Sequence, residues 1–256
     1  MNRTLRCLLV TATLMLAVGT AGALELRVLS AGAVEPGMKP ALAAFERASG
    51  HVVRLAFAAA PELRAALRAA AAGDVIVAPQ AALDEADVPI DVRAPIGRVG
   101  VGIAIRQAAD APDIASAESL KAALTSADSV VFNRASTGTY IEAMLQRLGI
   151  AAAVEAKTTR VADGASVMRR LLAGTSPREF GFAAMTEIVL FRDQGIRLVG
   201  PLPPALQNNT NYVAAPWPGS AHGDLSRDDA VAALMRHLKS AESRAIFAGA
   251  GIEPPP

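Results

Sequence analysis

The chain has 256 residues, of which 52% are hydrophobic and 4% aromatic, and its 25 basic residues balance 24 acidic ones to a formal charge of +1. A nearly neutral protein offers no electrostatic reason to bind nucleic acid or an anionic membrane surface. The sole cysteine, Cys7, lies near the N-terminus. The rest of the chain therefore has no disulfide, no thiolate nucleophile and no thiolate metal site.

The first 23 residues have the pattern of a secretory signal peptide. Arg3 and Arg6 form a short basic segment, an apolar run follows over 8–18, and Ala21-Gly22-Ala23 supplies small residues for cleavage. The apolar run is shorter than the roughly 18 residues that a membrane-spanning helix needs. We therefore expect a periplasmic protein that starts at Leu24 and is not membrane-embedded, with a formal charge of −1 once both arginines are removed.

After this leader, short β-rich segments alternate with longer alanine-rich helical segments. In a first passage we expect strands at 26–29, 51–57 and 74–78 and helices at 38–48 and 61–72. A β-rich stretch follows at 98–105, and a second passage has strands at 129–132, 181–184 and 196–199 and helices at 119–126, 138–148 and 164–173. One long helix over 228–247 closes the chain. Such alternation is typical of parallel sheets covered by helices.

Two successive α/β passages predict an α/β protein with two lobes, each a mainly parallel sheet flanked by helices, and a ligand cleft between the lobes. About 230 residues after the leader exceed the usual size of a single core. We assign 1–23 to the signal peptide, 24–105 to the first part of lobe 1, 106–212 to lobe 2, and 213–256 to the return into lobe 1. Lobes that close on a ligand are a common binding architecture.

Several short motifs, weak one by one, occur in an informative order. They are Val28-Leu29-Ser30-Ala31-Gly32-Ala33, Gly73-Asp74-Val75, Gly138-Thr139-Tyr140, Gly164-Ala165-Ser166-Val167, Pro201-Leu202-Pro203 and Asn211-Tyr212-Val213. In this order the chain resembles the periplasmic substrate-binding proteins of ABC importers, within them the molybdate-binding branch with the type II solute-binding fold. The resemblance runs over 26–253. It implies a receptor that captures a small-molecule or oxyanion ligand and delivers it to an ABC transporter permease.

Proteins of the molybdate-binding branch hold a tetrahedral oxyanion with hydroxyls and with backbone N–H groups at helix N-termini, which attract anions without a full counter-charge. The resemblance, together with the polar residues of lobe 2, places the ligand site on ten residues: Ser30, Ala31, Ala59, Ala60, Arg134, Ser136, Thr137, Gly138, Val167 and Ala184. Ser136, Thr137 and the N–H of Gly138 can form an anion nest, and Arg134 can make a bidentate contact with a carboxylate. The alternatives are that Ser136 and Thr137 only cap a helix and that Arg134 faces solvent.

The chain departs from the family pattern at two of these positions. The second family serine meets Ala58-Ala59-Ala60-Pro61, where the proline also removes an N–H group, and the family's cleft tyrosine meets about Ala184. Buried acceptors left without donors are expensive. We therefore expect a wider, more apolar cleft without the phenol, and a small anionic ligand other than molybdate. Molybdate or tungstate remains the alternative.

The sequence lacks the groupings of reactive side chains that are typical of enzymes. The three histidines, His51, His222 and His237, lie in unrelated segments, and neither a G-x-S-x-G elbow nor an H-E-x-x-H motif occurs. Glu35 and Asp74 are isolated carboxylates that we expect to cap helices or face solvent. We thus expect no enzyme activity, metal or cofactor, and a monomer. A receptor that presents its ligand to a sensor protein, or a periplasmic enzyme, remains as an alternative of another class.

Overall fold

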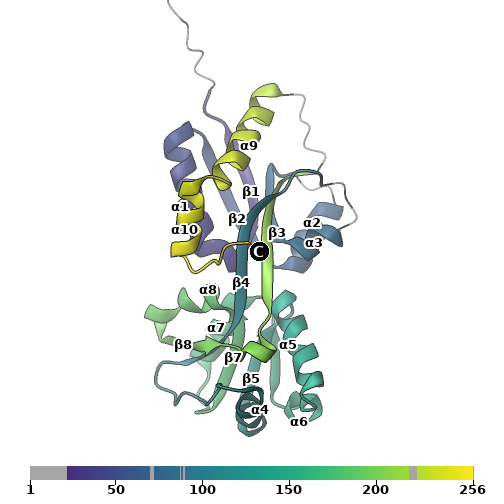
Figure 1. Cartoon of the computed structure of the whole chain (residues 1–256), viewed down its shortest axis with the longest axis vertical. Coiled ribbons are helices and arrows are strands. Elements are labelled where there is room, and N and C mark those ends of the chain that lie inside the picture. Colours follow the sequence, from purple (N-terminus) through teal and green to yellow (C-terminus); the bar gives the residue numbers. More distant parts are fainter. Residues whose placement is uncertain (1–21, 70–71, 87, 89, 219–223, 256) are drawn as a thin grey trace, which may run out of the picture.

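The computed structural model describes residues 22–69, 72–86, 88, 90–218 and 224–255, so nearly all of the predicted signal peptide lies outside the described residues. In this part of the chain, nine strands join in the order β2-β1-β3-β9-β4-β7-β5-β6, with β8 also paired to β4. Helices cover the sheet in two lobes, one above the other in Figure 1. The predicted two-lobed α/β fold is confirmed.

Lobe 1 is built around a parallel sheet in which β1 lies between β2 and β3. All five residues of β3 are buried, as expected of a central strand in a sheet with two covered faces. Its elements are β1 (Glu25–Ala31), the 3-10 turn η1 (Gly32–Val34), α1 (Glu35–Ser49), β2 (Val52–Ala58), α2 (Ala60–Arg68), β3 (Val75–Pro79) and α3 (Gln80–Asp84).

Lobe 2 repeats this arrangement, with β5 paired in parallel to both β6 and β7. Every residue of β5 and of β7 is buried. The elements of this lobe are α4 (Ala117–Ser126), β5 (Ser129–Asn133), α5 (Ser136–Arg147), α6 (Ala151–Glu155), β6 (Thr158–Val161), α7 (Gly164–Ala173), β7 (Glu179–Ala184), α8 (Met185–Val189), η2 (Arg192–Gln194), β8 (Ile196–Pro201) and η3 (Pro204–Leu206).

Two antiparallel strands, β4 (Ala94–Arg106) and β9 (Asn209–Pro216), connect the lobes (Figure 1). Up to Gly100, β4 pairs with β9, whereas from Val101 onward it pairs with β7 and β8 of lobe 2. Strand β9 also pairs with β3 of lobe 1. One long strand thus takes part in both sheets, and the lobe boundaries assigned from the sequence stay predictions.

Each lobe has its own hydrophobic core. In lobe 1, α1 and the C-terminal helices pack together on one face of the sheet, with Met38, Leu234 and Phe247 among the buried side chains. In lobe 2, the two faces of the sheet have separate clusters, one around Phe132 and Phe182, the other on α7. In the part of the chain that the structure describes, no helix has the length and hydropathy needed to span a bilayer.

The prediction of a single long helix over 228–247 is wrong, because the structure has two helices there: α9 (Leu225–Leu238) and α10 (Ala241–Gly249). Ser240 begins the second helix, since its side chain accepts a hydrogen bond of 3.1 Å from the Ser243 N–H. Serine at an N-cap satisfies one of the N–H groups that a helix start leaves unpaired. The apolar spacing continues through the break, which is why periodicity alone missed it.

The expectation that Asp74 caps a helix or faces solvent is also wrong. Asp74 is fully buried at the start of β3, where its carboxylate accepts a hydrogen bond of 2.6 Å from the Arg27 N–H and forms an ion pair of 2.7 Å with Arg227. A buried charge needs such partners. Nearby, Trp217 is also buried, and a Cβ atom at Gly73 would come within 2.4 Å of its indole ring.

Candidate functional site: a pocket between the lobes

A pocket of about 460 Å³ lies between the lobes and is lined by residues of both. Its volume falls in the usual range for small-molecule sites, roughly 300–1,000 Å³. Lobe 1 and β9 contribute the turn Ala31 to Ala33, Glu35, the segment Phe57 to Ala60, Pro79 and Tyr212. Lobe 2 contributes Asn133, Ala135 to Thr137, Asp163 to Ala165, Arg169, Glu187, Leu190, Phe191 and Gln194.

Three helices begin at this pocket: α2 with Ala59 and Ala60, α5 with Ala135 to Thr137, and α7 with Asp163 to Ala165. The first N–H groups of a helix have no carbonyl partner within the helix and carry a partial positive charge. Each helix starts here because it follows a strand whose carboxyl end lies at this edge of the sheet. The arrangement presents backbone donors from both lobes to an acceptor-bearing ligand.

Five of the ten residues predicted for the site line this pocket. They are Ala31, Ala59 and Ala60 on the lobe 1 side and Ser136 and Thr137 on the lobe 2 side. Thr137 is almost completely buried, at 7% exposure, although it belongs to the first turn of α5. The structure therefore brings together the alanine turn of lobe 1 and the hydroxyl-bearing turn of lobe 2.

The other five predicted residues are not among those that line the pocket, and for all ten a role in binding stays a prediction. Ser30 is fully buried within β1, and its hydroxyl donates to the Ala31 carbonyl at 3.2 Å. Val167 packs in the core of lobe 2, Ala184 is buried at the end of β7, and Arg134 is exposed. Gly138 lies so close to β5 that an added Cβ atom would be 1.5 Å from the Asn133 carbonyl oxygen.

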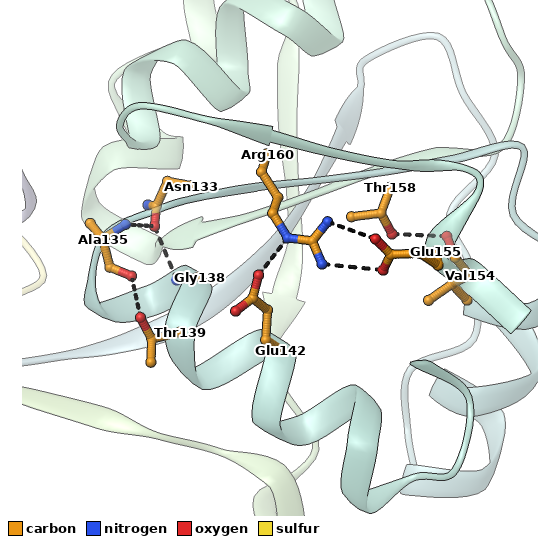
Figure 2. Close-up of polar contacts among 9 residues, drawn as sticks. All are labelled: Asn133, Ala135, Gly138, Thr139, Glu142, Val154, Glu155, Thr158 and Arg160. Carbon is orange, nitrogen blue, oxygen red and sulfur yellow. Dashed lines mark hydrogen bonds and ion pairs between the residues drawn. The ribbon is translucent and has the colours of Figure 1, made fainter. Parts of the chain in front are cut away.

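Asn133, a pocket residue that the sequence reasoning missed, organises the turn before α5 (Figure 2). Its side-chain oxygen accepts hydrogen bonds of 3.0 Å from the N–H groups of both Ala135 and Gly138. Asparagine commonly orders a turn in this way, so its place directly after a buried strand was an available signal. This contact holds Ser136 and Thr137 at the pocket.

Arg160 is not among the residues that line the pocket. It lies on β6 and forms ion pairs with Glu142 and Glu155, as Figure 2 shows. Its guanidinium carbon also lies 5.2 Å from the centre of the Phe132 ring. These contacts stabilise the outer part of lobe 2 rather than a ligand.

Of the described residues that line the pocket, three are acidic, namely Glu35, Asp163 and Glu187, and one, Arg169, is basic. Asp163 caps α7 by accepting a 2.7 Å hydrogen bond from the Ser166 N–H, and Arg169 lies 3.7 Å from the Asp163 carboxylate. Glu35, which we expected to cap a helix or face solvent, lies in the first turn of α1 and lines the pocket. The lining therefore has more acidic than basic side chains.

Glu187 has the most unusual environment of these acids. It lies on α8, and its carboxylate accepts a 3.3 Å hydrogen bond from the Ala184 N–H. Burial, partly opposed by that hydrogen bond and reinforced by the negative charges of Asp163 and Glu35, raises its pKa to about 7. No pattern in the sequence marks this residue, because its environment comes from three separate segments.

The expectation of a cleft without a phenol is wrong, because Tyr212 lines the pocket from β9. The side chain is buried, and burial together with the nearby Glu187 raises its pKa above the ordinary value. The resemblance implied that the family's tyrosine is replaced at about Ala184, whereas this chain supplies a phenol to the pocket from β9. Among the described residues, no group of three or more His, Cys, Asp or Glu side chains is placed to hold a metal ion.

Two α/β lobes, crossing strands and an inter-lobe pocket at helix N-termini together define a solute-binding protein of the periplasmic class. The comparison with known families agrees with this. The chain belongs to the bacterial extracellular solute-binding protein family, whose model matches residues 26–253. The predicted resemblance to the molybdate-binding branch is confirmed at the level of family and fold.

Similar solved structures include the periplasmic molybdate-binding protein of Azotobacter vinelandii, which is 15% identical with a TM-score of 0.70 over 90% of this chain and 100% of that one. The sulfate-binding protein SubI of Mycobacterium tuberculosis is 16% identical, with a TM-score of 0.67 over 90% of this chain and 86% of that one. At these identities they establish the fold. A curated relative, the aconitate isomerase of a Pseudomonas species, is 28% identical over 246 residues, 90% of this chain and 88% of that protein.

Proposed function

We propose that this protein is a periplasmic receptor that encloses a small carboxylate-bearing anion between its lobes and delivers it to the permease of an ABC importer. The observation that carries the proposal is the convergence of the α2, α5 and α7 N-termini on one pocket from both lobes. Such termini bind carboxylates and other anions through backbone N–H groups. Arg169 adds a charged donor to the same lining.

The acidic residues of the lining argue for an organic anion rather than molybdate or tungstate. The lining has three acidic side chains, Glu35, Asp163 and Glu187, and one basic side chain, Arg169. Two like unit charges about 5 Å apart repel by about 3 kcal/mol at an effective dielectric constant of about 20. A compact dianion concentrates its charge near these carboxylates, whereas an extended carboxylate ligand can place its charges at the helix N-termini and its carbon skeleton against Phe57, Leu190 and Phe191.

A thermal-shift screen tests the proposal, because a ligand that binds the folded state raises the melting temperature by mass action. The compounds are trans-aconitate, cis-aconitate, citrate, molybdate, tungstate, sulfate and phosphate. We expect a shift with at least one carboxylate and none with the inorganic oxyanions. A shift with molybdate or tungstate alone would refute the ligand class.

Thr137→Trp locates the site, because its indole fills the pocket from the lobe 2 side. We expect the folded variant to lose every ligand-induced shift. Its own melting temperature should fall by several degrees, because Thr137 is almost completely buried and the larger ring overpacks its surroundings. Thr125→Trp, at an exposed position on α4, is the matched control and should keep the shift. An unchanged ligand response in Thr137→Trp would remove the α5 turn from the site.

Delivery to a permease and presentation to a sensor protein use the same pocket and the same closure. The identity of the neighbouring genes distinguishes these two roles. Neighbouring permease and ATPase genes support import, and a neighbouring kinase gene supports sensing.

The second candidate function is an isomerase that moves a proton on an unsaturated carboxylic acid. Glu187, whose pKa of about 7 lies near the working pH, is suited to general acid–base catalysis, and the 28% identical relative is an aconitate isomerase. Incubation of the protein with trans-aconitate, followed by proton NMR, tests this function. Formation of cis-aconitate that Glu187→Gln abolishes would establish it, and unchanged trans-aconitate would leave the protein a receptor.

A further inference from the structure

The Glu187 carboxyl group occupies the junction between the closing faces of the two lobes. An added Cβ atom at Gly164, at the start of α7 in lobe 2, would lie 2.1 Å from one of its oxygens, and one at Gly32, in the first turn of lobe 1, 3.0 Å from the other. Beside Gly32, the Thr186 hydroxyl donates a 2.5 Å hydrogen bond to the Ala33 carbonyl, which ties α8 to the lobe 1 turn. The carboxyl group thus lies close to the backbone of both lobes.

The charged groups around Glu187 disfavour a negative charge there. Asp163, which caps the N-terminus of α7, and Glu35 on α1 line the same pocket, and Tyr212 faces it from β9. Three basic side chains on these helices have acidic partners. Arg169 contacts Asp163 and Ser166, Arg170 pairs with Glu179, and Lys39 pairs with Glu35.

The remaining elements packed on α8 are strands β4, β7 and β8, and their charged residues are paired away from the pocket. Arg98 pairs with Glu253, Arg106 pairs with Glu179, and Arg197 donates to the Ala109 carbonyl. A negative charge on Glu187 therefore meets two like charges. Among the described residues, only the Ala184 N–H and the N-terminus of α7 at Gly164 oppose their effect.

We propose that Glu187 takes up a proton when a carboxylate ligand enters the pocket, and that the resulting neutral carboxyl group donates a hydrogen bond to the ligand. This inference rests on the proposed function, because it takes the pocket as the ligand site. A ligand carboxylate adds a further negative charge near Glu187, which shifts its protonation in the same direction as Asp163 and Glu35 already do. Protonation changes the group from an acceptor into a donor.

If ligand binding takes up a proton, the affinity of the site for the ligand depends on pH. If one proton is taken up per ligand, the affinity falls by about tenfold for each pH unit above the pKa of the free site. The protein would then hold a carboxylate more tightly in a mildly acidic periplasm and release it more readily as the pH rises. Glu187 would be the residue that determines this property, through its own contact with the ligand.

Isothermal titration calorimetry with trans-aconitate tests the inference. Titrations at about pH 8 in two buffers with different ionisation enthalpies count the protons taken up, and titrations at several pH values from about 6 to 8.5 give the slope of the affinity. We expect uptake of close to one proton in the parent and a dissociation constant that rises by about tenfold per pH unit above pH 7. Glu187→Gln should bind with no proton uptake and no slope, whereas Glu118→Gln, an exposed helix residue of lobe 2, should behave as the parent.

The outcomes separate the two proposals. Binding by the parent without proton uptake or pH dependence would overturn the role of Glu187 and leave the receptor function standing. Loss of binding in a folded Glu187→Gln variant would also overturn it, because the ionised carboxylate would then be required. Absence of trans-aconitate binding by the parent at every pH would overturn the carboxylate-receptor function itself, and the Glu187 inference with it.

Discussion

Glu187→Gln should make the ligand-free protein more stable above pH 7 and leave its stability unchanged near pH 4.5. The pKa of this carboxyl group rises from an ordinary value of 4.5 to about 7 on folding, chiefly because the group is buried. Between these values the folded protein holds a proton that the unfolded chain has lost. The free energy of unfolding therefore decreases as the pH rises from 4.5 to 7, and the full penalty persists at higher pH.

The size of this effect follows from the same two pKa values. One pH unit corresponds to about 1.4 kcal/mol, so the penalty approaches roughly 3 kcal/mol above pH 7. In a protein of this size, 1 kcal/mol changes the melting temperature by about 2–4 °C, which predicts that the glutamine variant melts roughly 6–12 °C above the parent at pH 8. Glutamine keeps the shape of the side chain and cannot ionise, so the variant should not show this dependence.

Thermal and urea denaturation of both proteins from about pH 4.5 to 8.5 measures the difference directly. Glu118→Gln, on an exposed face of α4, is the matched control and should follow the parent at every pH. Parallel curves for Glu187→Gln and the parent would refute the reasoning, because they would mean that the Glu187 carboxyl group titrates alike in the folded and unfolded states.

Three further substitutions test other parts of the structure. Gly138→Ala should destabilise the protein by about 1–3 kcal/mol in urea denaturation, because its Cβ atom would lie 1.5 Å from the Asn133 carbonyl oxygen; wild-type stability would contradict this packing. Ser240→Ala removes the N-cap of α10 and should lower the free energy of unfolding by about 1 kcal/mol, measured the same way. Thr186→Val removes the hydrogen bond to the Ala33 carbonyl between the lobes and should speed amide hydrogen exchange at that turn, with a loss of about 1 kcal/mol; unchanged exchange would argue against this tie.

Local sequence signals predicted much of the fold. Alternation of strand-like and helical segments identified two α/β passages, and the Gly-Thr-Tyr motif at 138–140 located the start of α5 within two residues. The same signals failed at Ser240, where the apolar spacing runs through a capped break between two helices. Periodicity reports which face of an element is buried, and it does not report where one helix stops and another starts on the same face.

The candidate site was predicted only in part, for a related reason. Ser136 and Thr137 lie at the pocket as expected, because a turn between a buried strand and a helix faces the edge of the sheet wherever that sheet is placed. Glu187 and Tyr212 were missed as pocket residues, since one lies on a short helix after β7 and the other on a strand that returns to lobe 1. Nothing within their neighbouring residues distinguishes them from other side chains of the same kind.

The sequence by itself determined the class of the protein and the start of α5 to within two residues, because hydrophobic patterning and turn-forming residues act over short stretches of chain. Only the tertiary structure decided the charge of the pocket. Glu35, Asp163 and Glu187 come from three segments that the crossing strands bring together, and the raised pKa of Glu187 arises from burial and from the proximity of like charges. Both are properties of distances in space that separation along the chain does not encode.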